Sequence, residues 1–502
     1  LFRSQGTGNL YHYNDWSSPV GVIGAGNTVA DSFNIKTVLK DGTNPSIPKD
    51  ITFVGGYDGA PGPPISIARY WLYVYKNYSG TYSEWRQVYE NGGMFAAEGF
   101  TMKGSGKANS ANNIGQNYVF VGKPHNGDIG LEVASGWTYL TGNPYPSAMD
   151  ANQFIDDNKN NIRGTIYFWE HWGRETHNLK QYQAGYATYN YTGGVNANKA
   201  VAKAQYDATA SGTKVPQRYI PVGQAFYAVG TTATSGLHNI KFNNSQRRFV
   251  TEENKDKSIF LKSASTNVKK VTTEGVDNRL KIRLNFNVKD VAFRQILLGV
   301  DERATDGIDY GFDSEPFEVL GTDLFWLVNT NKLVIQAVDE LPIKKVVPLG
   351  INMESSGLIK INVESIENPY ANMKVYIRDN YTMQTYDILE STFEVYLEKG
   401  EHYNKYSVVF INKYLNETLE DVVLNEVYVF IDNDHSTIKL SKSSDTVINK
   451  IVMFNAIGQQ LKVWSSNLES NNLELPINVS SGVYLLNIET NNGNISKKLF
   501  KN

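Results

Sequence analysis

The chain has 502 residues, of which 41% are hydrophobic and 20% charged, and it carries a formal net charge of −3 at pH 7. This composition is typical of a soluble globular protein of several domains, and it gives no global basic field that would favour nucleic acid as a partner. Because cysteine is absent, disulfides, thiolate metal sites and cysteine nucleophiles are excluded.

The first residue is Leu1, and the sequence shows neither a signal peptide nor a run of about 18 apolar residues. We therefore expect no membrane-spanning helix, and we interpret the chain as a mature or partial segment of a longer protein. Aromatic residues make up 12% of the chain and include 31 tyrosines. Together with frequent glycine and asparagine, they favour strands and turns over helices.

Composition divides the chain into three units. Six of the eight tryptophans lie at or before Trp172, and the polar residues 251–258 separate this aromatic region from a plainer one. A second polar, serine-rich stretch covers residues 431–446. The predicted units are an aromatic-rich β domain over 1–250, a second β-sandwich domain over 255–432 and a small unit over 435–502.

Helices are expected to be few. In the first unit, "SAMDANQFIDDN" predicts a helix that Asp150 caps, with Gln153 three residues later completing a capping box. The alanine-rich residues 196–210 predict a second helix. The stretch "GVIGAGNTVA" contains Gly24 and Gly26 but lacks the third glycine of a dinucleotide-binding turn, so we exclude that function.

The stretch "YFWEHWGRETH" is the strongest metal candidate, because His171, Glu175 and His177 would share one face of an extended strand. Gly173 and Arg174 favour a turn that breaks this face, and the spacing is not H-E-x-x-H on a helix. We therefore expect ordinary strand-edge packing for these side chains, and no firm metal site.

Aromatic side chains are dense between Tyr167 and Tyr191. Rings on a rigid β-scaffold can stack on the apolar faces of sugars while their polar edges bond hydroxyl groups. Because strand alternation turns only about half of them outward, we expect core packing for most. The candidate glycan-binding residues are Trp169, Trp172, Tyr182 and Tyr186.

The second unit shows antiparallel strand patterns with one buried face, as in "GLIKINVE" and "TFEVYLEKG". The residues predicted to face inward are Ile359, Ile361, Val363, Phe393, Val395 and Leu397. The stretch "LFWLVNTNKLVIQAV" predicts a hairpin with its turn near residues 329–331.

An acidic loop, "ERATDGIDYGFDSE", places Asp306, Asp309 and Asp313 near two glycines. Calcium takes several carboxylate and carbonyl oxygens from a tight loop, although this spacing is not that of an EF-hand. We expect a solvated acidic turn, with bound calcium as the alternative and no other cofactor.

The last unit consists of short hairpins, and it predicts a minimal immunoglobulin-like sandwich of about six or seven strands. Asn455 suits the first position of a type I turn, and Gly458 suits the left-handed position that closes it. Gly482 opens the next strand, and Asn492-Gly493 predicts a two-residue hairpin turn. The predicted fold class is therefore mainly β, with tandem antiparallel, jelly-roll-like β-sandwiches before this small one.

The C-terminal pattern "MFNAIGQQL … SGVYLLNI … NGNISKKLFK" resembles the type A C-terminal sorting domain of the type IX secretion system of Bacteroidetes. The resemblance implies passage through an outer-membrane translocon, docking on an outer-membrane shuttle β-barrel and contact with a sortase-like protease. It also implies release, or attachment to surface lipopolysaccharide. The residues that it marks for recognition are Asn455, Gly458, Gly482, Tyr484, Gly493, Lys497, Lys498 and Lys501.

The terminal lysines have two compatible interpretations. They supply charge to a partner that pairs with the last strand by β-augmentation, or they protect an exposed strand edge against aggregation.

Segments of the larger body, such as "GTIYFWEHW" and "YIPVGQAF", resemble stretches that precede sorting domains in long Bacteroidetes surface proteins. They imply a secreted or cell-surface β architecture and bring no catalytic residues. We expect a non-enzymatic adhesin or surface scaffold, with glycans or lipopolysaccharide as candidate partners. The alternative is a secreted polysaccharide-degrading enzyme whose catalytic domain lies upstream or within residues 1–250. A third interpretation is a structural stalk without a ligand.

Overall fold

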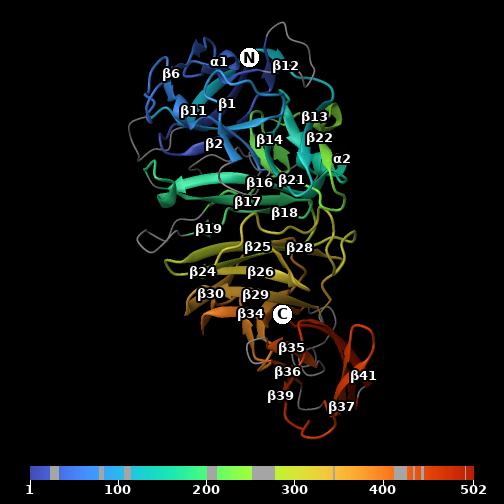
Figure 1. Cartoon of the computed structure of the whole chain (residues 1–502). Coiled ribbons are helices and arrows are strands. Elements are labelled where there is room, and N and C mark those ends of the chain that lie inside the picture. The colour runs from blue at the N-terminus through green and yellow to red at the C-terminus, as the bar shows by residue number, and fades with distance from the viewer. Residues whose placement is uncertain are drawn as a thin grey trace.

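The computed structural model is built almost entirely of strands, and its units follow one another from the N-terminus to the red C-terminal unit (Figure 1). As predicted, the fold is mainly β with antiparallel sheets throughout, apart from two parallel strand pairs. The structure describes residues 1–22, 33–77, 84–106, 115–173, 175–200, 212–250, 277–342, 345–411, 427–432, 436–442, 446–491 and 493–501.

One long sheet organises the first unit, in the strand order β18-β17-β16-β21-β14-β8-β10-β2, with β9 beside β8. Its strands are β2 (Tyr13–Ser17), β8 (Tyr73–Asn77), β9 (Trp85–Gln87), β10 (Gly99–Lys103), β14 (Thr138–Gly142), β16 (Ile162–Gly173), β17 (Gln183–Asn190), β18 (Gly193–Val195) and β21 (Ala225–Gly230). A hydrogen bond from Ser17 N to Gly223 O (2.9 Å) and a bridge between Trp16 and Gln224 bring β2 back beside the start of β21. The sheet therefore curls toward itself.

The two faces of this sheet differ because side chains alternate along each strand. One face is apolar and packs on two cores, one around Trp16 and Phe100 and the other around Phe154 and Phe168. We call the other side the aromatic face. Strand register places on it Tyr13, Asp15, Tyr73, Lys103, Tyr167, Trp169, His171, Tyr186 and Tyr227.

Shorter elements cover the apolar face and close the first unit. The strands are β1 (Phe2–Thr7), β3 (Val20–Gly21), β4 (Leu39–Asp41), β5 (Lys49–Asp50), β6 (Thr52–Val54), β7 (Ser66–Ala68), β11 (Gly115–Phe120), β12 (Lys123–Pro124), β13 (Ile129–Ala134), β15 (Ala148–Asp150), β20 (Tyr219–Ile220), β22 (Leu237–Phe242) and β23 (Arg247–Arg248). The helices are α1 (Ile35–Val38), α2 (Ala151–Asp157), η1 (Arg69–Trp71), η3 (Leu179–Gln181) and η4 (Asn244–Gln246).

Helix α2 forms where it was predicted, and Asp150 caps it by accepting a 3.1 Å hydrogen bond from Asn152 N. The predicted capping box is wrong, because Gln153 donates instead to Asp157 Oδ1 within the helix, at 2.9 Å. In the stretch predicted as a second helix, Lys199–Ala200 form strand β19, and residues 201–211 lie outside the described ranges. Gly24, Gly26 and the predicted linker 251–258 also lie outside them.

The second unit is a sandwich of two sheets around one core. One sheet contains β19, β24 (Lys281–Val288), β25 (Ala292–Val300), β28 (Ile335–Val338), β30 (Gly357–Glu367) and β33 (Phe393–Leu397). The other contains β26 (Asp323–Val328), β27 (Asn331–Leu333), β29 (Val346–Met353), β31 (Lys374–Asp379), β32 (Thr385–Asp387) and β34 (Gly400–Ile411).

The strand patterns of the second unit are confirmed. Ile359, Ile361, Phe393 and Leu397 are buried in the core, and the partly buried Val363 and Val395 pack against it. The predicted hairpin turns at Asn329, whose φ of 56° is left-handed. The chain then leaves this hairpin, since β28 crosses to the opposite sheet and pairs parallel with β25.

A segment of the second unit, residues 309–318, joins the first two units. Ser314 Oγ lies 2.8 Å from Thr165 Oγ1 and accepts a 2.8 Å hydrogen bond from Asn190 Nδ2. The Tyr310 hydroxyl donates to Ile155 O at 2.9 Å. Phe317 packs among aromatic residues of the first unit. We call residues 309–318 the joining segment.

The third unit is a small sandwich around its own core, which confirms the predicted two-layer arrangement. Among the described residues its strands are β35 (Tyr428–Asp432), β36 (Thr437–Ser441), β37 (Ile448–Asn455), β38 (Gln460–Trp464), β39 (Asn472–Pro476), β40 (Gly482–Thr490) and β41 (Gly493–Lys501). Strand β35 pairs with β36, so this unit includes residues before the predicted start at 435.

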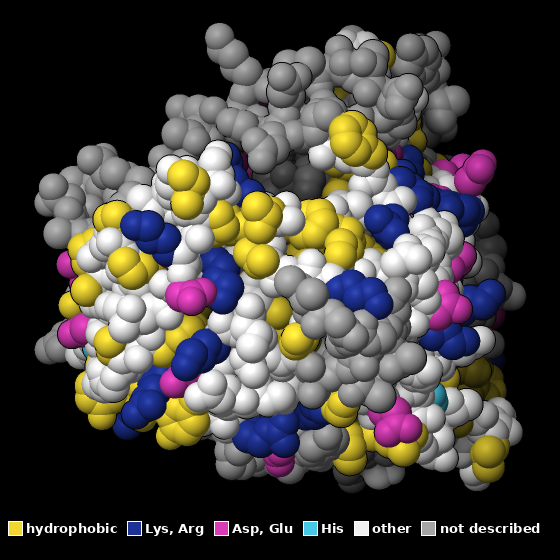
Figure 2. Space-filling model, turned by 90° about the horizontal axis from the view of Figure 1, so that it is seen from above, with side chains coloured by type: hydrophobic (Ala, Val, Ile, Leu, Met, Phe, Trp, Pro, Cys, Tyr) yellow, Lys and Arg dark blue, Asp and Glu magenta, His cyan; other side chains and the backbone are white. Residues whose placement is uncertain are grey.

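The molecular surface mixes both signs of charge. On the face that Figure 2 shows, Lys and Arg side chains lie among Asp, Glu and hydrophobic ones, and no single-sign field covers it. In the part of the chain that the structure describes, no helix has the length and apolarity needed to cross a membrane.

Replacing Arg294 by Leu should lower the free energy of unfolding of the second unit by about 3–5 kcal/mol, because the buried Asp323 would lose its charged partner. Arg294 Nε and Nη2 each lie 2.7 Å from an Asp323 oxygen, and both residues are buried. Urea unfolding measures the loss. Lys360→Leu breaks an exposed pair with Glu394 on the same sandwich and should cost less than about 1 kcal/mol. Equal losses would contradict this account.

Candidate functional site

The aromatic face holds a buried lysine, Lys103, at the end of β10. Lys103 Nζ lies 3.5 Å from the ring centroid of Trp71 and 4.8 Å from that of Tyr13, so its charge faces two π-systems. It donates a 2.6 Å hydrogen bond to the Tyr182 hydroxyl. Burial lowers the pKa of Lys103 to about 7, and the charge of Asp58 opposes part of this shift.

A short polar chain leads from Lys103 to the surface. Lys103 Nζ lies 2.9 Å from His177 Nδ1, and His177 Nε2 lies 2.7 Å from Asp58 Oδ1. The His177 ring also stacks on Trp71, with centroids 4.9 Å apart. Because the Asp58 side chain is exposed, this series of polar side chains links the buried Lys103 ammonium to solvent.

Two exposed tyrosines lie beside this chain, and we call them the rim pair. Tyr57 is 56% exposed and Tyr70 is 39% exposed, and their rings meet edge-on with centroids 4.9 Å apart. Trp71 Nε1 donates a 2.7 Å hydrogen bond to Tyr57 O, which ties the loop carrying Tyr57 to η1. The rim pair is therefore a fixed aromatic surface next to a carboxylate.

A second titratable group lies deeper on the same face. Burial raises the pKa of Asp15 from 3.8 to about 7, and the neighbouring Tyr227 hydroxyl opposes part of this shift. On the opposite side of β16, burial raises the pKa of Glu170 to about 7 while the charge of Lys214 opposes the shift. Both carboxyl groups are enclosed by the protein.

The four candidate glycan-binding residues do not form one surface. Trp169 and Tyr186 are cross-strand neighbours on the aromatic face, but the Phe317 ring lies 4.1 Å from that of Tyr186 and covers it. Tyr182 belongs to the Lys103 cluster. Trp172 packs against the core on the opposite face.

The two histidines of the metal candidate both lie near Lys103, but they do not form a metal site with Glu175. His171 is buried, stacks on His12 with centroids 4.2 Å apart, and has a lowered pKa because of its burial. Glu175 is exposed. Within the described ranges, no three His, Asp or Glu side chains gather closely enough to hold a metal ion.

The acidic loop uses its carboxylates to hold its own backbone. Asp309 Oδ2 accepts a 2.6 Å hydrogen bond from Thr305 N, and Asp306 pairs with Lys345. Asp313 Oδ1 accepts a 2.8 Å hydrogen bond from Ala337 N, and burial raises the pKa of Asp313 to about 7. Calcium binding at this loop stays a prediction.

The C-terminal unit shows the turn that its sequence predicts. Gly458 has a φ of +81°, its N–H donates to Asn455 O at 3.0 Å, and Asn455 Oδ1 accepts from Gln459 N at 2.9 Å. Tyr484 is buried, and its hydroxyl donates to Ser480 O at 2.6 Å.

The last hairpin differs from its prediction in one position. Gly493 pairs with Thr490 and is the first residue of β41, not the second residue of the turn, and Asn492 lies outside the described residues. Gly482 opens β40 as predicted. Strand β41 ends its sheet, and Lys498 on it is exposed. Lys497 is half-buried, and Lys501 Nζ donates to Ser436 Oγ at 3.1 Å.

Sequence reasoning missed Lys103, Asp58 and the rim pair. These residues come from separate loops and strands and carry no shared motif. The one available signal was the aromatic run "YWLYVY" at residues 70–75, which supplies Tyr70 and Trp71.

Two family models match the chain. One, described as "Domain of unknown function (DUF8693)", matches residues 63–410, and the other, "Secretion system C-terminal sorting domain", matches residues 432–502. The second match confirms the predicted type IX sorting domain, so the chain is cargo exported to the cell surface.

Other comparisons add little. No curated protein matches the sequence. A solved structure titled "Biofilm associated protein - BSP domain" aligns over 99% of this chain and 97% of its own, at 9% identity and a TM-score of 0.18. A TM-score this low does not indicate a common fold.

Asp15→Asn should stabilise the protein at pH 8 by on the order of 2–4 kcal/mol. The folded state holds the Asp15 proton more tightly than the unfolded state does. Wild-type stability therefore falls as pH rises from 3.8 to about 7, and Asn avoids this loss.

Thermal unfolding at pH 8 and at pH 4 measures the effect, which should be absent at pH 4. Asp50→Asn, on the surface strand β5, should bring no gain at either pH, since its pairing with Lys40 lowers the pKa of Asp50. A gain for Asp15→Asn that is equal at both pH values would refute the charge explanation.

Proposed function

The chain belongs to the family described as Domain of unknown function (DUF8693) and ends in a type IX sorting domain, and we propose that it serves at the cell surface as a glycan-binding adhesin or scaffold. The sorting domain accounts for its delivery. The first unit supplies the binding surface.

The rim pair is the observation that carries this proposal. Exposed tyrosine rings are typical sugar-stacking surfaces, because they offer apolar area and a polar edge with little side-chain freedom to lose. The 2.7 Å bond from Trp71 to the backbone of Tyr57 fixes the loop before any ligand arrives, and fixed contact surfaces lose less entropy on binding. The exposed Asp58 carboxylate can accept hydrogen bonds from sugar hydroxyls.

For export, we propose the partners that the sorting domain implies. These are the outer-membrane translocon, a shuttle β-barrel and a sortase-like protease, with lipopolysaccharide as a site of attachment. Strand β41 ends its sheet and carries the exposed Lys498, so it suits pairing with a partner strand.

A polysaccharide-degrading enzyme is less favoured. A glycosidase needs one carboxyl group whose raised pKa keeps it protonated and a second, ionised carboxylate, both facing the substrate. However, Asp15 and Glu170 lie on opposite faces of the sheet and both are buried, so neither meets a substrate from solution. The proposed function is therefore binding without catalysis.

The double substitution Tyr57→Ala/Tyr70→Ala should weaken binding to a responsive polysaccharide by about tenfold or more, since each lost ring contact contributes about 1 kcal/mol. Binding of the full chain to a polysaccharide panel, with and without calcium, measures this. Tyr396→Ala removes a ring that is 60% exposed in the second unit and should leave binding unchanged. Wild-type binding by the double variant, with circular dichroism showing it folded, would reject the rim pair.

Residues 427–502 fused to a folded reporter should carry it to the surface of a host with this secretion system. The shorter fusion 435–502 should export less, because it lacks β35, which pairs with β36 in the small sandwich. Protease accessibility of the reporter on intact cells measures export. A 427–502 fusion that stays in the periplasm would contradict the sorting role.

A further inference from the structure

A hollow lies on the side of the long sheet opposite the aromatic face, and the proposed function gives it no role. It has a volume of about 580 Å³, within the roughly 300–1,000 Å³ of small-molecule sites. Its lining includes Lys76 of β8 and Tyr139 of β14, whose strand neighbours Tyr75 and Leu140 lie on the aromatic face. Since side chains alternate, the hollow and the aromatic face lie on opposite sides of the sheet.

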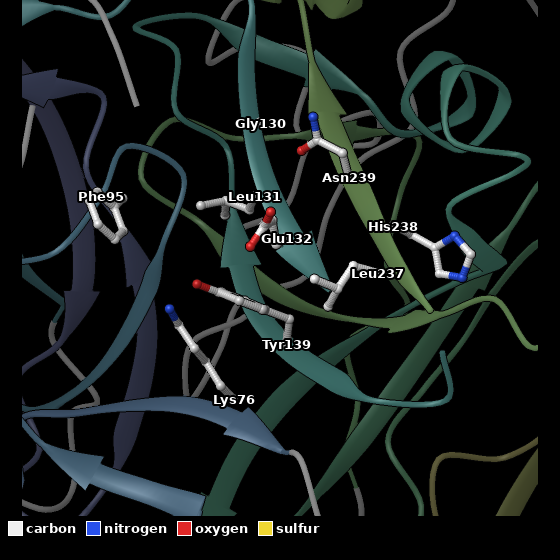
Figure 3. A pocket seen from close by; sticks show the side chains of 9 residues that line it. All are labelled: Lys76, Phe95, Gly130, Leu131, Glu132, Tyr139, Leu237, His238 and Asn239. Carbon is white, nitrogen blue, oxygen red and sulfur yellow. The ribbon is translucent and has the colours of Figure 1, made fainter. Parts of the chain in front are cut away.

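The floor of the hollow is an internally neutralised cluster. Lys76 Nζ lies 2.7 Å from Glu98 Oε1, and the Tyr139 hydroxyl donates to the same oxygen at 2.6 Å. Figure 3 shows the Lys76 and Tyr139 tips directed toward each other beside the hollow. Because Glu98 is buried and already pairs with Lys76, the floor offers little net charge to a ligand.

The wall of the hollow carries two polar groups that have no partner among the described residues. Glu132 on β13 and Asn239 on β22 lie directly opposite each other across the strand pair, and both are exposed. The Cβ atoms of directly opposed residues lie about 5 Å apart, so the two side chains can contact the same ligand. A carboxylate and a carboxamide side by side offer acceptors and donors for neighbouring hydroxyl groups.

Apolar groups complete the lining. Phe95 is 41% exposed and Leu237 is 65% exposed, and Figure 3 places Phe95 across the hollow from Glu132. Gly130 leaves room for the Asn239 amide, since a Cβ there would lie 2.5 Å from Asn239 Oδ1. A ligand held here meets an aromatic ring, an alkyl side chain and a hydrogen-bonding pair.

We propose that this hollow is a second saccharide site, which binds a neutral pyranose unit. The ring's C–H face would lie on Phe95 or Leu237 while its hydroxyls bond Glu132 and Asn239. An anionic sugar is disfavoured because Glu132 repels it and Lys76 is committed to Glu98. With the rim pair on the other face, one chain then holds two glycan segments at once. The inference stands on its own residues and survives if the rim pair fails.

The test uses the full chain and a set of simple probes. Saturation-transfer NMR measures binding of methyl glucoside, methyl mannoside, methyl galactoside and methyl N-acetylglucosaminide, with glucuronate and choline as charged probes. We expect at least one neutral glycoside to bind. Glu132→Ala and Gly130→Ala should each weaken it about tenfold or more, the first by removing the acceptor and the second by displacing the Asn239 amide.

Two controls separate this site from the rim pair. Lys241→Ala changes an exposed residue of β22 that does not line the hollow, and Tyr57→Ala/Tyr70→Ala changes only the rim pair, so both should leave glycoside binding intact. The inference is overturned if no neutral glycoside binds, if only glucuronate or choline binds, or if folded Glu132→Ala and Gly130→Ala proteins bind as wild type does.

Discussion

The structure of the first two units depends on one constraint: both faces of the long curled sheet must be covered. Alternation along the strands sends apolar residues to one side, where two cores bury them. The other side, the aromatic face, carries tyrosines and charged groups. Without a covering segment, these side chains would be exposed to solvent. The joining segment, residues 309–318 of the second unit, covers part of this face with Phe317 and bonds Ser314 to Thr165 and Asn190. The second unit therefore supplies part of the packing of the first unit.

Strand identity was predictable from sequence because alternation is a local property. Ile359 and Phe393 face the core as their patterns indicate, and the Asn455–Gly458 turn forms because its residues encode it locally. The sorting domain was predictable for the same reason, since its signals are short and ordered along the chain. These local signals also explain the helix cap at Asp150.

The sites were not predictable, because they arise from contacts between distant residues. Lys103 and His177 meet across 74 positions, and Asp58 reaches His177 across 119. Composition marked Trp169 and Trp172 as one group, yet strand parity separates them to opposite faces. The parallel pairing of β28 escaped prediction in the same way, because nothing in a hairpin pattern shows that its second strand will change sheets.

The joining segment also decides how the protein can be divided. A fragment ending near residue 250 would retain the strands of the first unit but lose Phe317, and so would expose the rings of Tyr167, Tyr186 and Tyr227 that it contacts. Such a surface favours aggregation. Recombination that exchanged one unit without the other would break the same contacts, so we expect the first two units to be expressed and grafted together.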